Sequence, residues 1–321
     1  QRQMCIRDSS GYQKALTFMT GLDALLDDDC EPLKGKRVGL ITNQTGVSSG
    51  IIQNIELFIE SENVDLRAIF SPEHGLFGSI SAGKKIIDRD ESKYGVPIFS
   101  LYGDTRKPSE DMLKDLDILV FDIQDIGIRS YTYISTMGLA MDAAADKGIE
   151  FMVLDRPNPM GLNKIEGNVL DPRLSSFIGM YPIPYVYGLT AGELATMIND
   201  QDWLGGSKCN LTIVKMRNYG REISYNDLGS IWIPTSPHVP SFETPMYMVA
   251  TGILGELGMF SIGVGYTTPF MTMAAPWINS DLMAERMNML GLEGVVFRPV
   301  NYRPYYSFYK DDEVGGVQIH I

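Results

Sequence analysis

Short apolar runs alternate with amphipathic stretches along the first half of the chain. Five of these runs, at residues 37–42, 64–70, 96–101, 117–121 and 150–154, are nearly continuous in apolar residues. Such runs are typical of strands that are buried on both faces of a parallel sheet.

The stretches between these runs carry the spacing and end signals of helices. Ser49 is expected to cap a helix whose apolar positions begin at Ile51, and Ser109 a short helix rich in acids. A long helix is expected over residues 132–147, ended by Gly148. Further along, Thr190 and Glu193 fit a capping box, which explains Glu193 as a helix-end residue.

The alternation of strands and helices predicts an α/β fold, with a Rossmann-like doubly wound parallel sheet over residues 20–185. Residues 186–321 are less regular and predict a second, smaller α+β domain. The chain stops inside a strand pattern, so we expect this domain to be incomplete at its C-terminus. Residues 1–19 are expected to be an unnatural leader, because residues 4–9 read like translated adaptor sequence.

The composition narrows the function classes. The formal net charge is −13, which argues against a nucleic-acid partner, because such proteins need a basic surface. No apolar run reaches the ~18 residues of a membrane span. The three histidines are scattered along the chain (His74, His238 and His320), so no metal site is expected. No cofactor is expected either. For His238, a structural or rim role is favoured. The oligomeric state is left open.

Candidate chemistry follows the five predicted strands. Ligands of open parallel sheets bind outside the carboxyl ends of the strands, and right-handed crossovers bring those ends to one edge. Here every strand is followed by polar residues with Gly or Pro, and we expect them to form one cleft. These segments are residues 42–46, 71–75, 101–104, 121–127 and 154–159.

Glu73 is the leading candidate for a general acid, since a shielded carboxyl can hold its proton near neutral pH; the alternative is a carboxylate that caps the next segment. Asp122 and Asp125 are candidates for a second carboxylate, and Asp125 for a helix cap. For the neighbours Asp155 and Arg156, the favoured interpretation is a structural ion pair.

Other polar residues at this edge have two interpretations each. Asn43 and Asn158 can hydrogen-bond sugar hydroxyls or bridge loop backbone. Tyr131 and Tyr133 can stack on a sugar ring, although packing is the commoner role.

A nucleotide site is weakly supported. The sequence has no G-x-G-x-x-G after the first strand and no Walker lysine motif, although Glu73 stands where a ribose-binding acid would lie. Besides an enzyme that uses Glu73 as a general acid, two other functions stay open: a non-catalytic carbohydrate-binding protein and a nucleotide-dependent sugar-modifying enzyme.

Long, ordered motifs nevertheless give the sequence a family resemblance. It closely resembles the NamZ-like exo-β-N-acetylmuramidases over nearly the whole chain after residue ~20. The motifs that carry the resemblance are residues 38–46, 71–75, 100–103, 107–108, 120–127, 129–137, 154–159, 166–167, 187–190, 192–195 and 316–320. Residues 77–84 and 262–270 depart from the family pattern; many members carry an arginine in the second of these segments, so the exact sugar and linkage stay open.

The resemblance implies a glycoside hydrolase that releases terminal β-linked N-acetylmuramic acid from peptidoglycan fragments, in a cleft between two domains. It implies that Glu73, in the Pro-Glu-His-Gly motif, is the catalytic acid, and a periplasmic or extracellular location. With the cluster at the sheet edge, it gives Glu73, His74, Asp122 and Asp125 as catalytic candidates. The substrate-binding candidates are Asn43, Gln44, Tyr102, Gln124, Arg129, Tyr131, Tyr133, Asp155, Arg156, Asn158 and Glu166.

Overall fold

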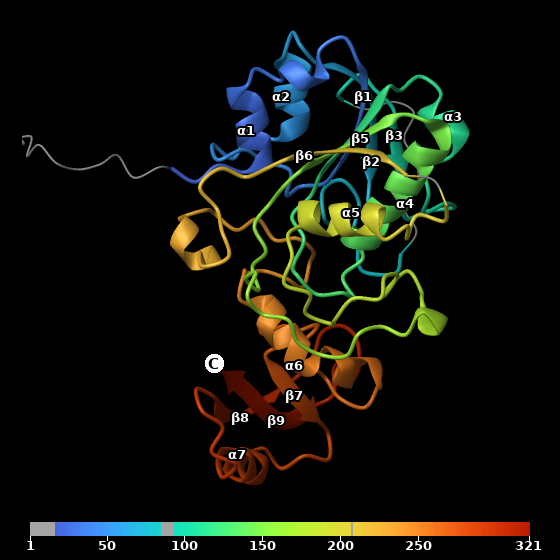
Figure 1. The fold of residues 1–321 in the computed structure, drawn as a ribbon. Coiled ribbons are helices and arrows are strands. Elements are labelled where there is room, and N and C mark those ends of the chain that lie inside the picture. The colour runs from blue at the N-terminus through green and yellow to red at the C-terminus, as the bar shows by residue number, and fades with distance from the viewer. Residues whose placement is uncertain (1–16, 85–92, 207) are drawn as a thin grey trace, which may run out of the picture.

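A computed structural model describes residues 17–84, 93–206 and 208–321 (Figure 1). The adaptor-like residues 4–9 lie outside this part of the chain. The described residues form a six-stranded parallel sheet flanked by helices and a three-stranded antiparallel sheet near the C-terminus. The predicted α/β class with a smaller α+β domain is confirmed.

The elements have the following bounds. The large sheet contains β1 (Arg37–Thr42), β2 (Asp65–Ser71), β3 (Ile98–Ser100), β4 (Ile118–Asp122), β5 (Glu150–Leu154) and β6 (Asn210–Val214). The helices around it are α1 (Gly21–Asp27), α2 (Asn54–Glu60), α3 (Glu110–Leu113), α4 (Tyr133–Lys147) and α5 (Ala191–Asp200). The C-terminal part contains α6 (Thr244–Glu256), β7 (Thr272–Ala275), α7 (Ser280–Asn288), β8 (Val296–Tyr302) and β9 (Val314–His320).

The large sheet has the strand order β3-β2-β1-β4-β5-β6, and each neighbouring pair is parallel. This is the doubly wound order, in which the chain starts in the middle and builds outwards in both directions. The carboxyl ends of the strands therefore lie at one edge. Because β6 pairs with β5 along its whole length, the sheet extends well beyond residue 185, the boundary expected from the sequence.

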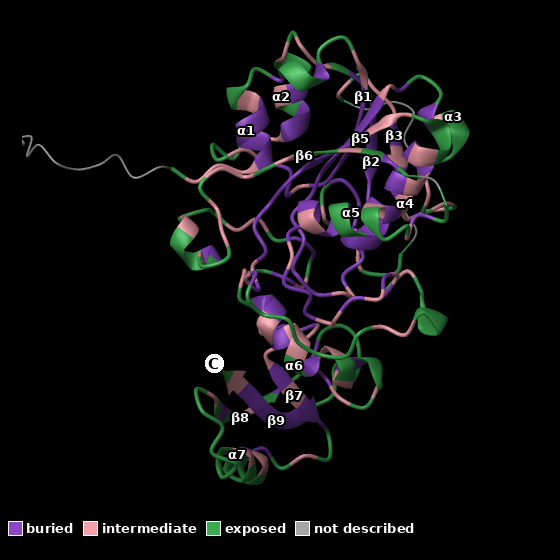
Figure 2. Ribbon diagram, viewed as in Figure 1, coloured by how far each residue is buried: buried purple, intermediate pink, exposed green. Residues whose placement is uncertain are grey.

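Alternating side chains of the strands face two separate cores, as the period of two along a strand requires. Leu40 of β1 and Val120 of β4 lie in the core under α1 and α2. Ile41 and Phe121, the next residues along, lie in the larger core under α4 and α5. Figure 2 shows the strands buried on both faces, which explains why their sequences are apolar without alternation.

Three of the four helix ends that the sequence predicted are confirmed. Ser109 caps α3, Gly148 ends α4 in the left-handed conformation, and Thr190 begins α5 with a capping box. The expectation for Ser49 was wrong: α2 begins at Asn54, and the Ser49 amide instead donates to Asp23 Oδ1 at 2.8 Å.

The N-terminal boundary also differs from the expectation. Met19 forms backbone hydrogen bonds in both directions with Arg217, at 3.1 and 3.0 Å, and Thr20 caps α1. Residues 17–19 therefore belong with the folded domain, because Met19 forms an antiparallel bridge with Arg217 in the segment that follows β6.

The second domain is built on an antiparallel sheet of order β7-β9-β8, covered by α7. Helix α6 connects it to the large domain: Met246 and Met248 pack on the larger core, and Thr251 Oγ1 donates to the carbonyl of Phe270 at 2.8 Å. None of the described helices is long and apolar enough to cross a bilayer.

Candidate active site

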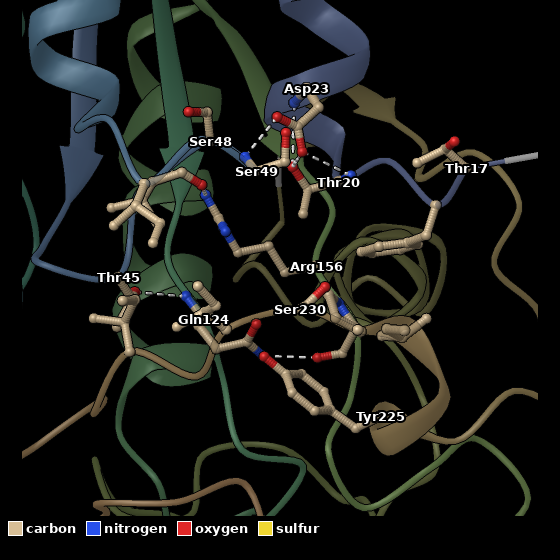
Figure 3. Close-up of a pocket in the computed structure, with 18 residues that line it drawn as sticks. Thr17, Thr20, Asp23, Thr45, Ser48, Ser49, Gln124, Arg156, Tyr225 and Ser230 are labelled. Carbon is tan, nitrogen blue, oxygen red and sulfur yellow. Dashed lines mark hydrogen bonds between the residues drawn. The ribbon is translucent and has the colours of Figure 1, made fainter. Parts of the chain in front are cut away.

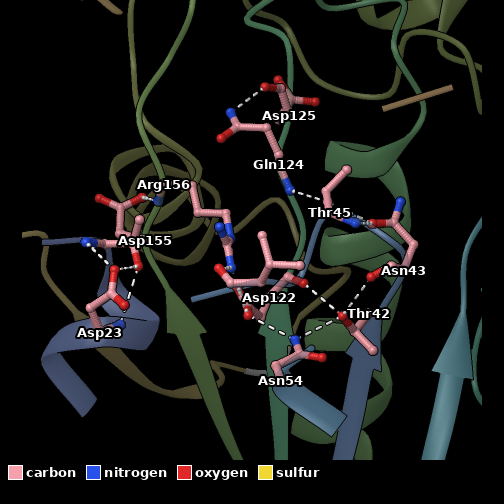
Figure 4. A network of polar contacts seen from close by, with 12 residues as sticks. Asp23, Thr42, Asn43, Thr45, Asn54, Asp122, Gln124, Asp125, Asp155 and Arg156 are labelled. Carbon is pink, nitrogen blue, oxygen red and sulfur yellow. Dashed lines mark hydrogen bonds and ion pairs between the residues drawn. The ribbon is translucent and has the colours of Figure 1, made fainter. Parts of the chain in front are cut away.

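The loops after β1, β4 and β5 are tied together by buried hydrogen bonds at the carboxyl edge (Figure 4). Thr45 Oγ1 accepts from the backbone amide of Gln124 at 2.9 Å. The Gln124 side-chain amide donates to the carbonyls of Asp125 and Pro157, both at 2.7 Å. Gln124 thus holds the β4 and β5 loops together through backbone groups.

Glu73 lies two residues past the end of β2 and is 6% exposed. One carboxylate oxygen accepts from the backbone amide of Gly83 at 2.9 Å. The other accepts from the hydroxyl of Thr132, the residue that precedes α4, at 2.7 Å. Both partners are neutral, and no described cation forms an ion pair with this carboxylate.

His74 follows Glu73 in a left-handed backbone conformation, with φ of 71°, and is buried. Its Nδ1 lies 2.7 Å from the carbonyl oxygen of Ile80, a contact that requires the proton on Nδ1. The imidazole therefore presents Nε2 as an acceptor when it is neutral. This contact and that of Gly83 fold the 74–83 segment around Glu73.

Tyr102 lies at the matching position past the end of β3, the strand next to β2. Ser71 of β2 pairs with Ser100 of β3, so Glu73 and Tyr102 both lie two residues beyond a paired position. Burial raises the pKa of Tyr102, and the Glu73 carboxylate raises it further, while the Arg106 guanidinium lowers it. The tyrosine hydroxyl thus lies within reach of an anion and of a cation.

Asp122 is at the end of β4 and is fully buried. It accepts from Arg156 Nε at 2.5 Å and Nη2 at 2.9 Å, and from Asn54 Nδ2 at 2.7 Å. The expected partner of Arg156 was Asp155, so that pairing is corrected. Both oxygens are bound to protein groups and the side chain is fully buried, which favours a structural role for Asp122; its role as a second catalytic carboxylate stays a prediction.

Asp125 has a different environment. Its Oδ2 accepts from the Gly127 amide at 2.7 Å and from the Tyr187 hydroxyl, while its buried Oδ1 has no hydrogen-bond partner among the described residues. Burial raises its pKa to about 6. Asp125 does not cap α4, because the residue before that helix is Thr132.

Asp155 supports the start of α5. It accepts from Thr190 Oγ1 at 2.7 Å and from the Gly192 amide at 2.9 Å, and burial raises its pKa to about 6. Asn158 likewise binds backbone, since it donates to the carbonyl of Leu189 and accepts from the Met160 amide. These two candidates shape the loops and have backbone or capping partners.

The pair Tyr131 and Tyr133 holds a later segment of the chain over the edge. Their hydroxyls donate to Thr235, at 2.8 Å to its Oγ1 and 2.5 Å to its carbonyl oxygen. Gln44 Nε2 donates to the same carbonyl at 3.1 Å. The side-chain atoms Asn43 Nδ2 and Gln44 Oε1 are buried and have no partner among the described residues.

Two candidates lie outside this cluster. The Arg129 guanidinium donates to the carbonyls of Asn168 and Ile183, at 2.7 and 2.6 Å, and so braces the loop after β5. Glu166 is exposed and pairs with Val186 through its backbone.

His238 was expected to have a structural or rim role, and the structure shows what it contacts. Its ring stacks on Tyr306 of the second domain, with centroids 5.9 Å apart and an interplanar angle of 21°. Burial lowers its pKa, and so does the charge of nearby His74. The second domain therefore reaches the rim next to the Glu73 loop.

Arg106 and Phe177 were missed at the sequence level. The guanidinium of Arg106 lies 4.2 Å from the ring centroid of Phe177 and 5.3 Å from that of Tyr102. Arg106 follows the predicted third strand closely enough to have been included among the edge residues. Phe177 lies in a long loop and carries no signal in the sequence.

A separate cavity of about 250 Å³ lies at the same edge but on the side of α1 (Figure 3). Arg156, Gln124 and Thr45 line it, together with Tyr225 and Ser230 from a later loop. Glu73 does not line this cavity. Among the described residues, no group of three His, Cys, Asp or Glu is arranged to hold a metal ion.

The fold and the site define a two-domain α/β protein with a buried acid among polar loops at the carboxyl edge of its sheet, where such folds bind ligands. Family models of the exo-β-N-acetylmuramidase NamZ match residues 38–243 for its N-terminal part and 246–321 for its C-terminal part. The chain therefore belongs to the NamZ family of exo-β-N-acetylmuramidases.

Individual relatives agree with this assignment. The peptidoglycan β-N-acetylmuramidase NamZ of Bacillus subtilis (strain 168) is 44% identical over 302 residues, which cover 94% of this chain and 72% of that protein. A crystal structure of a DUF1343 family protein from Bacteroides fragilis NCTC 9343 superposes with a TM-score of 0.89 at 50% identity, covering 95% of this chain and 77% of the other. A second such structure from the same strain gives 0.75 at 32% identity, with coverage of 94% and 76%.

Proposed function

We propose that this chain hydrolyses the bond to a terminal β-linked N-acetylmuramic acid of peptidoglycan fragments, with Glu73 as the proton donor. The hydrolase class follows from the family. The observation that supports Glu73 is its set of partners: it is a buried carboxylate at the sheet edge that accepts from the neutral donors Thr132 and Gly83, and no described cation forms an ion pair with it. Asp122, in contrast, is held by a buried arginine.

In this mechanism Glu73 protonates the glycosidic oxygen as the leaving sugar departs, and positive charge develops on the ring of the N-acetylmuramic acid. Water then forms the new bond at C1 of that ring, and the proton it releases restores the protonated Glu73. Thr132 orients the carboxyl group by donating its hydroxyl proton to one of the carboxyl oxygens. The Gly83 amide fixes the second oxygen. The proton is thus held at a defined position before the bond breaks.

Asn43 Nδ2 and Gln44 Oε1, which have no hydrogen-bond partner in the described part of the chain, support a polar substrate at this edge of the sheet. The Gln44 side chain lies against Gly78 in the Glu73 loop, where an added Cβ would come within 2.3 Å of it. A buried amide without a partner costs free energy until a ligand satisfies it. An acetamido sugar offers both a carbonyl oxygen and an N–H group for this purpose.

Glu73→Gln tests the role of the acid. We expect kcat for a MurNAc-GlcNAc disaccharide to fall by about 10²- to 10⁴-fold, the usual contribution of a general acid. A 4-nitrophenyl MurNAc glycoside should be affected less, because its leaving group needs little protonation. Release of free MurNAc and of 4-nitrophenol measures the two rates.

Glu62→Gln is the matched control, since Glu62 is exposed and precedes β2 at its opposite end. It should leave both rates unchanged. If Glu73→Gln retains full activity on the disaccharide, or slows both substrates equally, Glu73 is not the proton donor.

The proposed site of action is the periplasm or the cell exterior, where intact peptidoglycan lies.

A further inference from the structure

We propose that Arg106 is a specificity-determining residue that binds the lactyl carboxylate of N-acetylmuramic acid. This inference rests on the proposed function, since it assigns part of the same substrate. N-acetylmuramic acid differs from N-acetylglucosamine by a lactyl ether at C3, which adds a carboxylate. An enzyme that selects the first sugar therefore needs a cation near its acid.

Arg106 is held in place by two aromatic rings, and none of the described carboxylates pairs with it. Its guanidinium lies over the rings of Phe177 and Tyr102, at 4.2 and 5.3 Å from their centroids. The two rings are 5.8 Å apart and come from distant segments of the chain. Stacking on aromatic faces orients a guanidinium while leaving its N–H groups free to bind a carboxylate in a bidentate way.

Most other arginines of the described chain are paired. Arg37, Arg67 and Arg156 form ion pairs with aspartates, and so do several arginines in later segments. Arg106 is exposed, and no described carboxylate lies within ion-pair distance of it, although the chain has a net charge of −13. An arginine with no ion-pair partner in the described part of such an acidic chain is available for an anionic ligand.

Tyr102 links this cation to the acid. The Arg106 guanidinium lies 5.3 Å from its ring centroid, and the pairing of Ser71 with Ser100 puts Glu73 and Tyr102 each two residues past a paired position of neighbouring strands. The Glu73 carboxylate raises the pKa of Tyr102 and the Arg106 guanidinium lowers it. The C3 ether and the bond at C1 belong to one sugar ring. A proton donor and a carboxylate-binding cation separated by one tyrosine match that ring.

The experiment compares two chromogenic substrates that differ at the lactyl group alone: 4-nitrophenyl β-MurNAc, which is anionic, and the same glycoside with its lactyl carboxylate converted to the neutral methyl amide. We expect Arg106→Gln to lower kcat/KM for the acid by about 10- to 100-fold, as for loss of a charge-assisted hydrogen bond. The methyl amide should be nearly unaffected. Arg106→Lys should fall between, because it keeps the charge but loses the planar fork.

Arg67→Gln is the control, because Arg67 is also exposed but lies toward the opposite end of β2. An equal loss on both substrates would give Arg106 a merely structural role, and no loss on the acid would overturn the proposal. Glu73→Gln slows the MurNAc-GlcNAc disaccharide and affects the two nitrophenyl glycosides alike, whereas Arg106→Gln separates the two glycosides by charge, so failure of the two proposals is distinguishable. If the chain turns over neither glycoside, calorimetry compares the binding of free MurNAc with that of its methyl amide. The proposal requires the original chain to bind the acid more tightly than the amide, and Arg106→Gln to lose this difference.

Discussion

The buried pair of Asp122 and Arg156 allows a quantitative prediction of stability. The side chains are 0% and 6% exposed, and three hydrogen bonds of 2.5–2.9 Å bind both oxygens of the carboxylate. Removing one partner leaves the other charge buried and unpaired, which costs about 3–5 kcal/mol. We therefore expect Asp122→Asn and Arg156→Met each to lower the free energy of unfolding by this amount.

The double variant should be much less destabilised than the sum of the single variants, with a coupling energy of at least ~2 kcal/mol. Urea unfolding measures these values, followed by both circular dichroism and tryptophan fluorescence so that two-state behaviour is tested. Additive effects, or single effects below about 1 kcal/mol, would refute the buried ion pair.

The same variants test the role of Asp122 in the reaction. Because both of its oxygens are bound to protein groups, folded Asp122→Asn should retain most of its kcat at a temperature well below its melting point. A loss of about 100-fold or more in the folded variant would instead make Asp122 a catalytic carboxylate.

Two further predictions concern burial. Burial raises the pKa of Asp125 in the folded state from 3.8 to about 6, so the folded state binds a proton more tightly than the unfolded state does. The resulting contribution to the free energy of unfolding is fully present below pH ~4 and is lost as pH rises through about 6. Asp125→Asn should therefore remove on the order of 3 kcal/mol from the fall in unfolding free energy between pH 4 and 7, measured by urea titration at each pH; an unchanged slope would contradict it. Gly138→Ala places a Cβ 1.6 Å from the Tyr181 hydroxyl oxygen in the core, so overpacking of about 1–3 kcal/mol should exceed the ~1 kcal/mol gain in helix propensity. The melting temperature should fall, and Tyr181→Phe should recover part of the loss; a more stable single variant would show that the core relaxes freely.

The sequence was sufficient for the features that depend on short stretches of chain. Apolar runs predicted five strands of the parallel sheet, and capping residues such as Ser109 and Thr190 predicted helix ends, because these signals act over a few residues. The rule for carboxyl ends then placed Glu73 at the edge. β6 was missed because its residues are only half-buried or exposed, so its apolar pattern is weak.

Only the tertiary structure decided which polar groups at that edge are free. Arg156 stands next to Asp155 in the sequence but pairs with Asp122 from another strand, because side chains of neighbouring residues leave the backbone in different directions. Arg106 meets Phe177 only after two distant loops fold against each other. Partner choice depends on distances between separate elements, and local sequence patterns carry no information about those distances.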